Sequence, residues 1–301
     1  MNLNQPLVTV VIPTYNHAHL LKRALESVVA QTFREWEAIV VNNFSTDATA
    51  EVVKAFNDSR IRLVDFNNSG IIAASRNQGI KLAIGEFIAF LDSDDKWYDT
   101  KLQRCVEQTQ HGYQFISHGE LWIESDLSKR KVMYGPEKNA NYARLLFRGN
   151  CISTSAVFVG AELIRSVKGF DESAEIVTAE DYELWLRLAS TSPKTIFIQE
   201  ILGEFHRTKN SASSAVLRNL DSEKVVLKKH FALQNKNVLT KLRMRHRLAI
   251  ANYGAARQFS DQISQALALF WQAFKLSPLV IKIYPAIGLL LIKSIFSRKS
   301  I

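Results

Sequence analysis

The sequence predicts an α/β protein in which a mixed, mainly parallel sheet is flanked by helices, with a helical appendage at the C-terminus. Three observations lead to this prediction. Short apolar runs rich in β-branched residues alternate with amphipathic segments, the connections between them are short, and polar clusters follow the apolar runs. Strands and helices that alternate in this way favour right-handed crossovers and hence parallel strands.

The first part of the chain supplies four of the expected strands. Residues 7–12 are apolar and β-branched, and Pro13 is expected to end this strand. Residues 17–32 carry apolar side chains at helical spacing. A polar residue within 45–47 can cap the next helix. The other elements expected here are a strand over 36–41, a helix ending near 56, a strand over 60–66, a helix over 71–83 and a strand that begins at 87.

The middle of the chain has a looser pattern. Residues 126–138 are charged and contain Gly and Pro, so we expect a loop that could close over a ligand. Thr178 and Asp181 have the spacing of a capping box at the start of a helix. The other expected elements are a helix over 101–109, strands over 113–124 and 152–159, helices over 161–167 and 178–189, and a strand over 195–206.

The C-terminal region is basic and helical. Residues 216–301 contain 15 Lys and Arg against 3 Asp and Glu, whereas the rest of the chain contains 23 against 26. We therefore divide the chain into an α/β domain over 1–215 and a basic helical region over 216–301. A helix is expected from Asp261 to Lys275, where apolar side chains lie along one face.

The apolar segment over 279–296 contains Lys282, Pro285 and Lys293, which makes it marginal for spanning a bilayer. We expect it to lie in the interface of a membrane, on the cytoplasmic face, with its basic side chains reaching for the headgroups. The alternative is a helix hairpin packed on the α/β domain. A nucleic-acid partner is not expected, because the basic residues are interleaved with apolar ones and no groove-reading motif is present.

Composition indicates a globular protein of a reducing compartment. Hydrophobic residues make up 47% and charged residues 22% of the 301. Cys105 and Cys151 provide neither a disulfide framework nor zinc-ligand spacing. The N-terminal apolar run stops at Pro13 and lacks a basic flank, so it is interpreted as a strand rather than a signal peptide.

Three acids follow the apolar run that begins at Phe87, namely Asp92, Asp94 and Asp95. If this run is a buried parallel strand, the acids lie at its carboxyl end, where open α/β sheets bind ligands. Neighbouring carboxylates repel one another, and a divalent cation with oxygen ligands would remove that conflict. The alternative is a solvated acidic turn.

Other polar residues lie where they could converge with these acids. Tyr15 could stack on a nucleobase, and the amide of Asn43 could hydrogen-bond to one, although both residue types are also common in turns. Arg76 could pair with phosphate oxygens or hold an acid of the cluster. Asp181 could act as a general base or simply suit a helix N-terminus. His206, which ends a predicted strand, could complete a metal shell or be partly buried.

In combination these motifs resemble the inverting glycosyltransferases of family two, which have the GT-A fold. The resemblance covers about residues 7–213, and the matching segments are VVIPTYN at 10–16, QTF at 31–33, VNNFSTD at 41–47, the stretch from Gly70 to Gly79, LDSDD at 91–95 and EDYELWLR at 180–187.

The resemblance implies a role for each matching residue. It places Pro13, Thr14 and Tyr15 at the base of a nucleotide-diphospho-sugar, with Asn43 hydrogen-bonded to that base. It implies that Asp92 contacts the ribose and that Asp94, with Asp95 beside it, binds Mn or Mg. It assigns Asp181 as the general base and His206 to the metal or the diphosphate. In the mechanism that we expect, the metal and Arg76 offset the charge that builds on the leaving diphosphate. The candidate site residues are therefore Pro13, Thr14, Tyr15, Asn43, Arg76, Asp92, Asp94, Asp95, Asp181 and His206.

The implied function is a metal-dependent, hexosyltransferase-like enzyme that acts on a glycan or lipid-linked acceptor in cell-surface polysaccharide synthesis. The sequence departs from the family pattern at Asn42, Asn43 and Phe44, where an aspartate pair and a glycine are usual. An amide can still accept from uracil or thymine, whereas guanine would lose more, so a UDP- or dTDP-sugar is favoured, UDP above all. The alternatives are a non-catalytic relative with a membrane-bound tail and a sugar nucleotidyltransferase.

Overall fold

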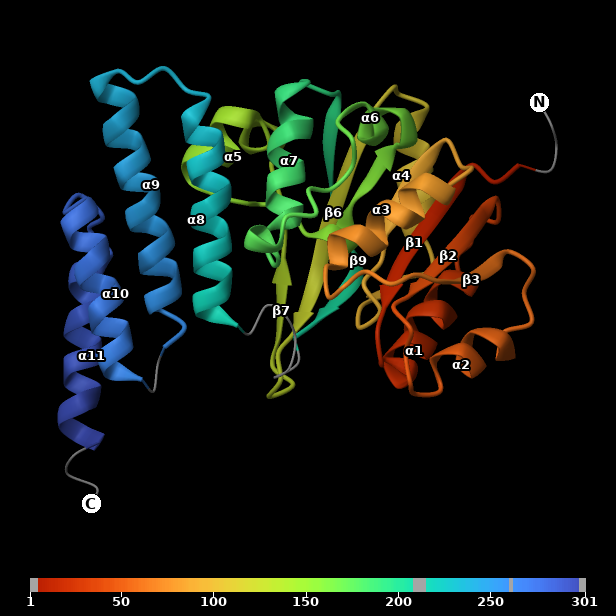
Figure 1. Cartoon of the computed structure of the whole chain (residues 1–301), viewed down its shortest axis with the longest axis horizontal. Coiled ribbons are helices and arrows are strands. Elements are labelled where there is room, and N and C mark those ends of the chain that lie inside the picture. Colours follow the sequence, from red (N-terminus) through yellow and green to blue (C-terminus); the bar gives the residue numbers. More distant parts are fainter. Residues whose placement is uncertain (1–4, 208–214, 260–261, 298–301) are drawn as a thin grey trace.

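The computed structural model describes residues 5–207, 215–259 and 262–297, with side chains up to residue 290. The described residues form one nine-stranded sheet with helices on both faces, and four further helices extend from one side of it (Figure 1). The expected helix start at Asp261 and the end of the resemblance at Ser213 lie outside the described residues.

The sheet is mixed and mainly parallel on its N-terminal side, as predicted. The strands are β1 (Val8–Thr14), β2 (Trp36–Asn42), β3 (Ile61–Asp65), β4 (Phe87–Phe90), β5 (Lys96–Trp97), β6 (Phe115–Ile123), β7 (Lys129–Val132), β8 (Phe158–Gly160) and β9 (Thr195–His206). Their order is β3-β2-β1-β4-β8-β6-β9-β5, with β7 paired to β6. The pairs β1–β2, β1–β4, β2–β3 and β6–β9 are parallel.

Eleven α-helices and three short 3₁₀ helices accompany the sheet in the described part of the chain. The α-helices are α1 (Ala18–Val29), α2 (Thr49–Ala55), α3 (Ile72–Leu82), α4 (Lys101–Thr109), α5 (Tyr142–Arg148), α6 (Ala161–Ser166), α7 (Glu180–Ser190), α8 (Val216–Ala232), α9 (Val238–Ala256), α10 (Ile263–Leu276) and α11 (Ile283–Ser297). The 3₁₀ helices are η1 (Glu137–Asn139), η2 (Thr154–Ala156) and η3 (Ala174–Ile176).

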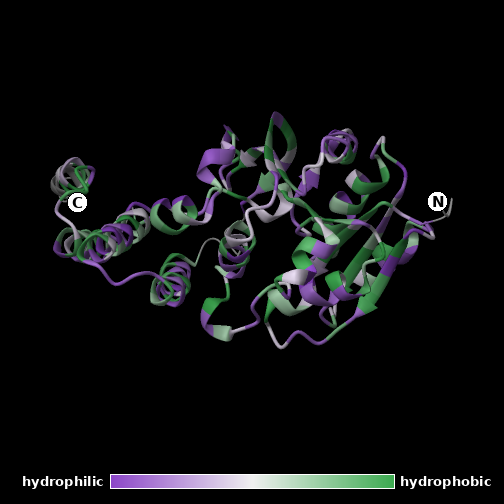
Figure 2. Ribbon diagram, turned by 90° about the horizontal axis from the view of Figure 1, so that it is seen from above, coloured by the Kyte–Doolittle hydropathy of each residue, from purple (hydrophilic) through white to green (hydrophobic). Residues whose placement is uncertain are grey.

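Two cores form because successive strand side chains point to opposite faces of the sheet. In β1, Val11 packs in the core under α3, α6 and α7, whereas Val10 and Ile12 pack in the core under α1 and α4. In β4, Phe90 packs in the first of these cores and Ala89 packs in the second. Hydrophobic residues accordingly line the central strands in Figure 2. The buried sheet therefore gives the strand ends fixed positions.

The carboxyl ends of β1, β2, β4, β6 and β9 meet at one edge of the sheet. β4 and β6 each run antiparallel to β8, so they run in the same direction as one another, and β9 is parallel to β6. Pro13 does not end β1, contrary to prediction. The pairing of β1 with β4 stops at Val11, so the missing N–H of Pro13 interrupts only an already unpaired side, and β1 continues to Thr14 beside β2.

The structure corrects several other local predictions. Part of the expected loop over 126–138 is the strand β7, whose Lys-rich sequence gave no apolar alternation. The expected strand over 152–159 is the short helix η2 followed by β8. No side chain caps α7: its N-cap is Ala179, and Thr178 has a φ of +87° and uses its N–H to bind Glu180. The helix α5 was not predicted.

Helices α8 to α11 form an appendage with its own small core, which includes Leu220, Ala249, Phe270 and Ile283. The appendage reaches the α/β domain through α8, which contacts α7, and α9, which contacts α5. Figure 2 shows these helices extending away from the body. No helix among the described residues is both long enough and apolar enough to cross a bilayer.

The packing of α3 on β1 yields a stability prediction. A Cβ on Gly79 would lie 2.3 Å from Cγ1 and 3.2 Å from Cβ of Val11, a branched side chain that is fully buried in the core. We expect Gly79→Ala to lower the free energy of unfolding by about 1–3 kcal/mol, measured by urea denaturation. Gly254→Ala in α9 is the matched control, because a Cβ there meets nothing within 4 Å. It should be neutral or stabilise by up to about 1 kcal/mol through helix propensity. Equal midpoints for wild type and Gly79→Ala would contradict the packing argument.

Candidate active site

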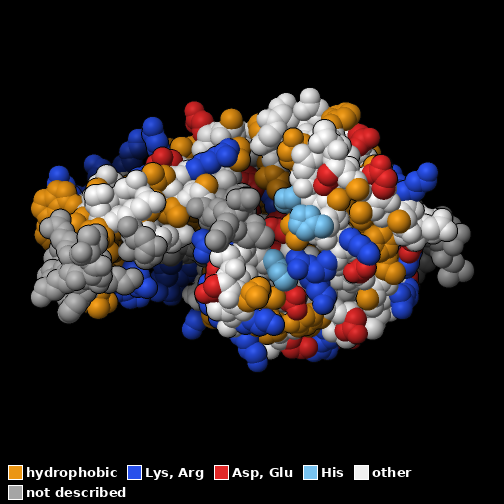
Figure 3. Space-filling model, turned by 90° about the horizontal axis from the view of Figure 1, so that it is seen from below, with side chains coloured by type: hydrophobic (Ala, Val, Ile, Leu, Met, Phe, Trp, Pro, Cys, Tyr) orange, Lys and Arg blue, Asp and Glu red, His pale blue; other side chains and the backbone are white. Residues whose placement is uncertain are grey.

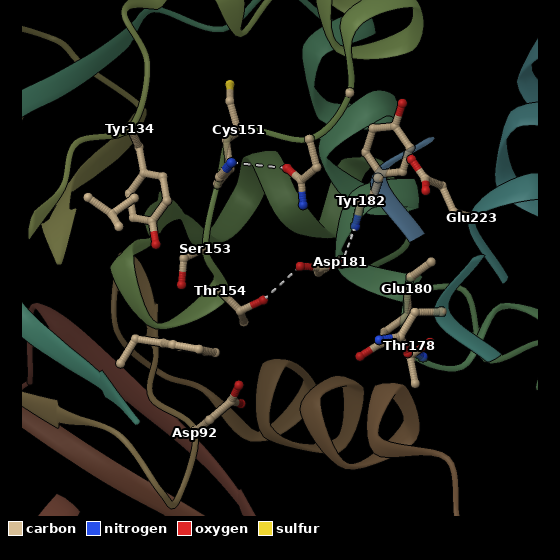
Figure 4. Close-up of a pocket in the computed structure, with 18 of the residues that line it drawn as sticks. Asp92, Tyr134, Cys151, Ser153, Thr154, Thr178, Glu180, Asp181, Tyr182 and Glu223 are labelled. Carbon is tan, nitrogen blue, oxygen red and sulfur yellow. Dashed lines mark hydrogen bonds between the residues drawn. The ribbon is translucent and has the colours of Figure 1, made fainter. Parts of the chain in front are cut away.

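A cavity of about 940 Å³ opens at the carboxyl edge of the sheet and continues to α8 and α9. Its volume is at the upper end of the roughly 300–1,000 Å³ that ligand sites occupy. Six of the sequence-predicted site residues line it: Pro13, Arg76, Asp92, Asp94, Asp181 and His206. Figure 4 shows Asp181 near the centre of the labelled side chains, and Figure 3 shows acidic and histidine side chains together on one face.

Arg76 connects two walls of the cavity. Its Nη2 donates to Asp92 at the end of β4, and its Nη1 donates to Glu180 at the start of α7, each at 2.7 Å. The residue is 3% exposed. Each terminal nitrogen of Arg76 holds an acid, which is the second of the two roles considered for this residue. We interpret Arg76 as a positioning residue.

Asp181 lies in the first turn of α7, half-buried in the cavity wall. One carboxylate oxygen accepts from the backbone N–H of Tyr182 at 2.5 Å, and the other accepts from the hydroxyl of Thr154 at 3.4 Å. Burial, followed by the charge of Glu180, raises the pKa of Asp181 to about 7, against the lowering effect of Arg76. A carboxylate with this pKa can take up a proton near neutral pH, as a general base must.

The acids after β4 differ in their surroundings. Asp95 is 1% exposed; its carboxylate accepts from the hydroxyl of Ser155 at 2.6 Å and from the backbone N–H of His206 at 2.9 Å. It therefore fastens the end of β9 to the cluster and does not line the cavity. Asp94 does line it, and burial together with the charge of Asp92 raises the pKa of Asp94 to about 6.

A divalent cation fits beside Asp94. The raised pKa means that the metal-free site holds more negative charge than its surroundings stabilise. Among the described residues no three His, Cys, Asp or Glu side chains gather closely enough to hold an ion alone. Mg²⁺ is commonly held by one or two carboxylates together with substrate phosphates, and carboxylate and water ligands also suit Mn²⁺. A diphosphate would therefore have to supply part of the coordination shell.

Both ring nitrogens of His206 contact protein side chains. Its Nδ1 lies 3.2 Å from Nη1 of Arg23, and its Nε2 lies 3.0 Å from a carboxylate oxygen of Glu204. Burial lowers the pKa of His206, with a further lowering from Arg23 that opposes Glu204. The side chain is thus a neutral imidazole near neutral pH, and binding an ion would require it to exchange one of these partners.

Of the residues expected around a nucleobase, Pro13 lines the cavity, whereas Thr14, Tyr15 and Asn43 lie beside it. Tyr15 is 54% exposed, and the hydroxyl of Thr14 is buried with no hydrogen-bond partner among the described residues. The carbonyl oxygen of Asn43 accepts from the backbone N–H of Asn68 at 3.0 Å. Asn43 therefore holds two loops together, and one lone pair of that oxygen stays available.

The departures at 42 and 44 have local explanations. The amide of Asn42 donates to Asp65 at 2.7 Å and accepts from the backbone N–H of Ser45 at 3.0 Å. An aspartate at 42 would instead bring two carboxylates together. Phe44 has a φ of +53°, the left-handed region in which glycine is unstrained. The loop keeps the backbone of a glycine-containing turn while carrying a phenylalanine.

Sequence reasoning missed Glu180, Thr154 and Ser155. Glu180 belongs to the same acidic motif as Asp181, but the sequence does not tell which acid faces Arg76. Thr154 and Ser155 lie in η2, within a segment for which the sequence predicts a strand. Sequence reasoning also missed the buried Glu120. Its carboxylate accepts from the hydroxyl of Tyr134 at 2.6 Å, and burial is the chief cause that raises its pKa to about 7.

Comparison with known proteins decides the family. The family described as "Glycosyl transferase family 2" matches residues 9–158. The UDP-Glc:alpha-D-GlcNAc-diphosphoundecaprenol beta-1,3-glucosyltransferase WfaP of Escherichia coli is 32% identical over 188 residues, which cover 62% of this chain and 72% of that protein. The chain belongs to glycosyl transferase family 2.

Solved structures agree on the fold. The TarS fragment of S. aureus in complex with UDP-GlcNAc has a TM-score of 0.63 at 17% identity, covering 89% of this chain and 81% of that one. The mannosyltransferase PcManGT of Pyrobaculum calidifontis, solved with GDP-Man and Mn²⁺, has a TM-score of 0.61 at 18% identity, covering 96% and 81%. The GT-A fold inferred from the resemblance is confirmed.

The crowding of acids yields a prediction on pH and stability. Because the pKa of Asp94 is raised in the folded state to about 6, the protonated folded form is favoured at low pH, and this stabilisation is lost as the pH rises from about 4 to above about 6. In the presence of a chelator, Asp94→Asn should unfold at higher urea than wild type at about pH 7.5, by on the order of 1 kcal/mol, and should differ less at about pH 4.

The control is Glu86→Gln, which removes an exposed carboxylate elsewhere in the chain. It should leave the urea midpoint unchanged at both pH values. A lower midpoint for Asp94→Asn at neutral pH would show that the charge of Asp94 is stabilised rather than strained by its surroundings.

Proposed function

We propose that this protein transfers a sugar from a UDP-sugar to a hydroxyl of a lipid-linked acceptor in polysaccharide synthesis, with inversion at the anomeric carbon. One observation carries the proposal: Asp181, whose pKa is about 7, lines the same cavity as Asp92 and Asp94. A proton acceptor thus lies in one cavity with a carboxylate suited to a metal-bound diphosphate.

The reaction follows from these positions. Asp181 takes the proton of the acceptor hydroxyl, whose oxygen attacks the anomeric carbon on the face opposite the diphosphate. The new glycosidic C–O bond forms as the bond to the diphosphate breaks, and UDP leaves with both bonding electrons. A divalent ion held by Asp94 would offset the charge on that leaving group. Arg76 keeps Asp92 and Glu180, and through Glu180 the start of α7, at fixed positions.

The uridine preference rests on Asn43 and on relatives. The carbonyl oxygen of Asn43 can accept the single N–H of uracil, whereas guanine presents two donors that a carboxylate would pair better. The name of WfaP specifies UDP-Glc as its donor, and TarS has been solved with UDP-GlcNAc. PcManGT has been solved with GDP-Man, so the fold by itself does not select the base.

The lipid-linked acceptor rests on the name of WfaP, which specifies a diphosphoundecaprenol acceptor. A peripheral position on the cytoplasmic face of the membrane is part of the same proposal. Large apolar side chains of the appendage are exposed, among them Trp271, Leu279 at 79% and Ile281 at 77%, close to Lys275 and Lys282. Apolar and basic side chains together suit an anionic lipid surface.

The general base is tested by Asp181→Asn. This variant should lose sugar transfer by about 10²-fold or more, because general acid–base catalysis contributes about that much, and it should bind UDP as wild type does. The wild-type rate should fall as the pH drops below about 7, where Asp181 becomes protonated. Glu175→Gln, an exposed carboxylate just before α7, is the control and should keep full activity. Near-normal transfer by Asp181→Asn would exclude Asp181 as the base.

The membrane contact is tested by replacing Leu279 and Ile281 together with serine. Burying one such side chain contributes about 1.5–3 kcal/mol, so the double variant should bind vesicles containing phosphatidylglycerol at least about tenfold more weakly in a sedimentation assay. Leu127→Ser is the control, because Leu127 is 78% exposed but lies in the loop between β6 and β7. Equal sedimentation of the double variant and wild type would exclude this surface.

A further inference from the structure

We infer that the wall of the cavity formed by α8 and α9 binds the diphosphate and the first isoprenoid units of the acceptor, so that the C-terminal appendage is part of the active site. This inference rests on the proposed function and extends it. Apart from Arg148, the binding residues that it assigns lie outside the family match at 9–158.

The cavity has two ends of different character. At the sheet it is lined by Asp92, Asp94 and His206, which suit a metal-bound diphosphate. At the far end it is lined by α8 and α9. In Figure 4, Tyr182 and Glu223 lie on the side of Asp181 away from Asp92. The general base thus stands between the two ends, as expected if donor and acceptor enter from opposite sides.

Between Arg247 and Gln258, the face of α9 toward the cavity is apolar and has little side-chain bulk. The lining residues of this helix include Ile250, Ala251, Gly254 and Ala255, whose spacing places them on one face. A Cβ on Gly254 would meet nothing within 4 Å, so the helix backbone borders open space at this point. None of these four residues has a side-chain group that can hydrogen-bond to a sugar, whereas an isoprenoid chain needs an apolar surface of this kind.

Two arginines lie at the start of this apolar face. Arg148, at the end of α5, lines the cavity with an exposed side chain that forms no ion pair with the described residues. Arg247 of α9 is 2% exposed; it pairs with Glu223, and its Nε has no hydrogen-bond partner among the described residues. A Cβ on Gly149 would lie 3.3 Å from Nη2 of Arg247, so the loop after Arg148 closes directly on the second guanidinium.

The arginine pair is also connected to the general base. Arg247 lies over the ring of Tyr182, with 6.0 Å from the guanidinium carbon to the ring centroid, and Tyr182 follows Asp181 in the chain. The two guanidinium groups and the carboxylate of Glu223 thus lie between the acids at the sheet edge and the apolar face of α9. That order matches an acceptor in which a diphosphate separates a sugar from an apolar chain, with the sugar hydroxyl at Asp181.

Gly254→Leu tests the inference without removing any interaction. Leucine is a better helix former than glycine, and the space around position 254 is open, so the variant should fold with at least wild-type stability. Its side chain would occupy the space that we assign to the isoprenoid. Gly288→Leu in α11 is the matched control, because a Cβ there also meets nothing within 4 Å and Gly288 does not line the cavity.

The probe is farnesyl diphosphate, titrated calorimetrically into protein saturated with UDP and Mn²⁺ so that the donor site is filled. We expect Gly254→Leu to weaken its binding by about tenfold or more and Gly288→Leu to leave it unchanged. Arg148→Gln should weaken the binding of both farnesyl diphosphate and inorganic diphosphate. Wild type should bind farnesyl diphosphate more tightly than inorganic diphosphate, because only the former has a chain.

Unchanged farnesyl diphosphate binding by Gly254→Leu would overturn the inference, and so would equal wild-type affinity for farnesyl and inorganic diphosphate. UDP binding, measured first in the same samples, reports separately on the proposed function. It should be the same in wild type, Gly254→Leu and Gly288→Leu. Loss of UDP binding in wild type would contradict the proposed function, whereas normal UDP binding without farnesyl diphosphate binding would contradict only the acceptor site.

Discussion

The site depends on one buried guanidinium. Arg76 joins Asp92 to Glu180, and these acids belong to elements that are distant in sequence, the end of β4 and the start of α7. Without that cation, Asp92, Glu180 and Asp181 would be left in a partly dry cavity with no fixed positive charge between them. Removing one partner of a buried charge pair commonly costs about 3–5 kcal/mol, so the geometry of the acids and the stability of the fold are coupled here.

The elements that the sequence predicts correctly are those whose bounds depend on the local pattern of apolar residues. The sequence predicted α4 and β9 with the bounds that the structure has, because apolar periodicity defines both. It also placed Asp92, Asp94 and Asp181 where they meet. It did not distinguish Asp95, which closes the cluster on Ser155 and His206, from Asp94, which faces the cavity. That difference depends on which neighbour approaches each carboxylate, and neighbours distant in sequence decide it. The strand β7 was missed because its edge position tolerates charged residues.

The departures from the family pattern are consistent with an intact site. Asn42 pairs with Asp65, and Asn43 supports the backbone of Asn68, so the two amides stabilise the loops around the expected base position. The structure also changes the interpretation of the C-terminal appendage. The sequence indicated a basic tail with a possible membrane contact, whereas the structure places α8 and α9 in the wall of the cavity. In our proposal, the inner helices bind the acceptor and the outer helices contact the lipid.

In our proposal, the acids around Asp94 bind a nucleoside diphosphate through a divalent metal ion. The most direct measurement is calorimetric titration of UDP, dTDP and GDP into the protein, with Mn²⁺ and with a chelator. We expect UDP to bind in the presence of Mn²⁺, its binding to fall by about tenfold or more in the chelator, and GDP to bind more weakly than UDP. Equal UDP binding with and without Mn²⁺, or no binding of any of the three nucleotides, would contradict this proposal.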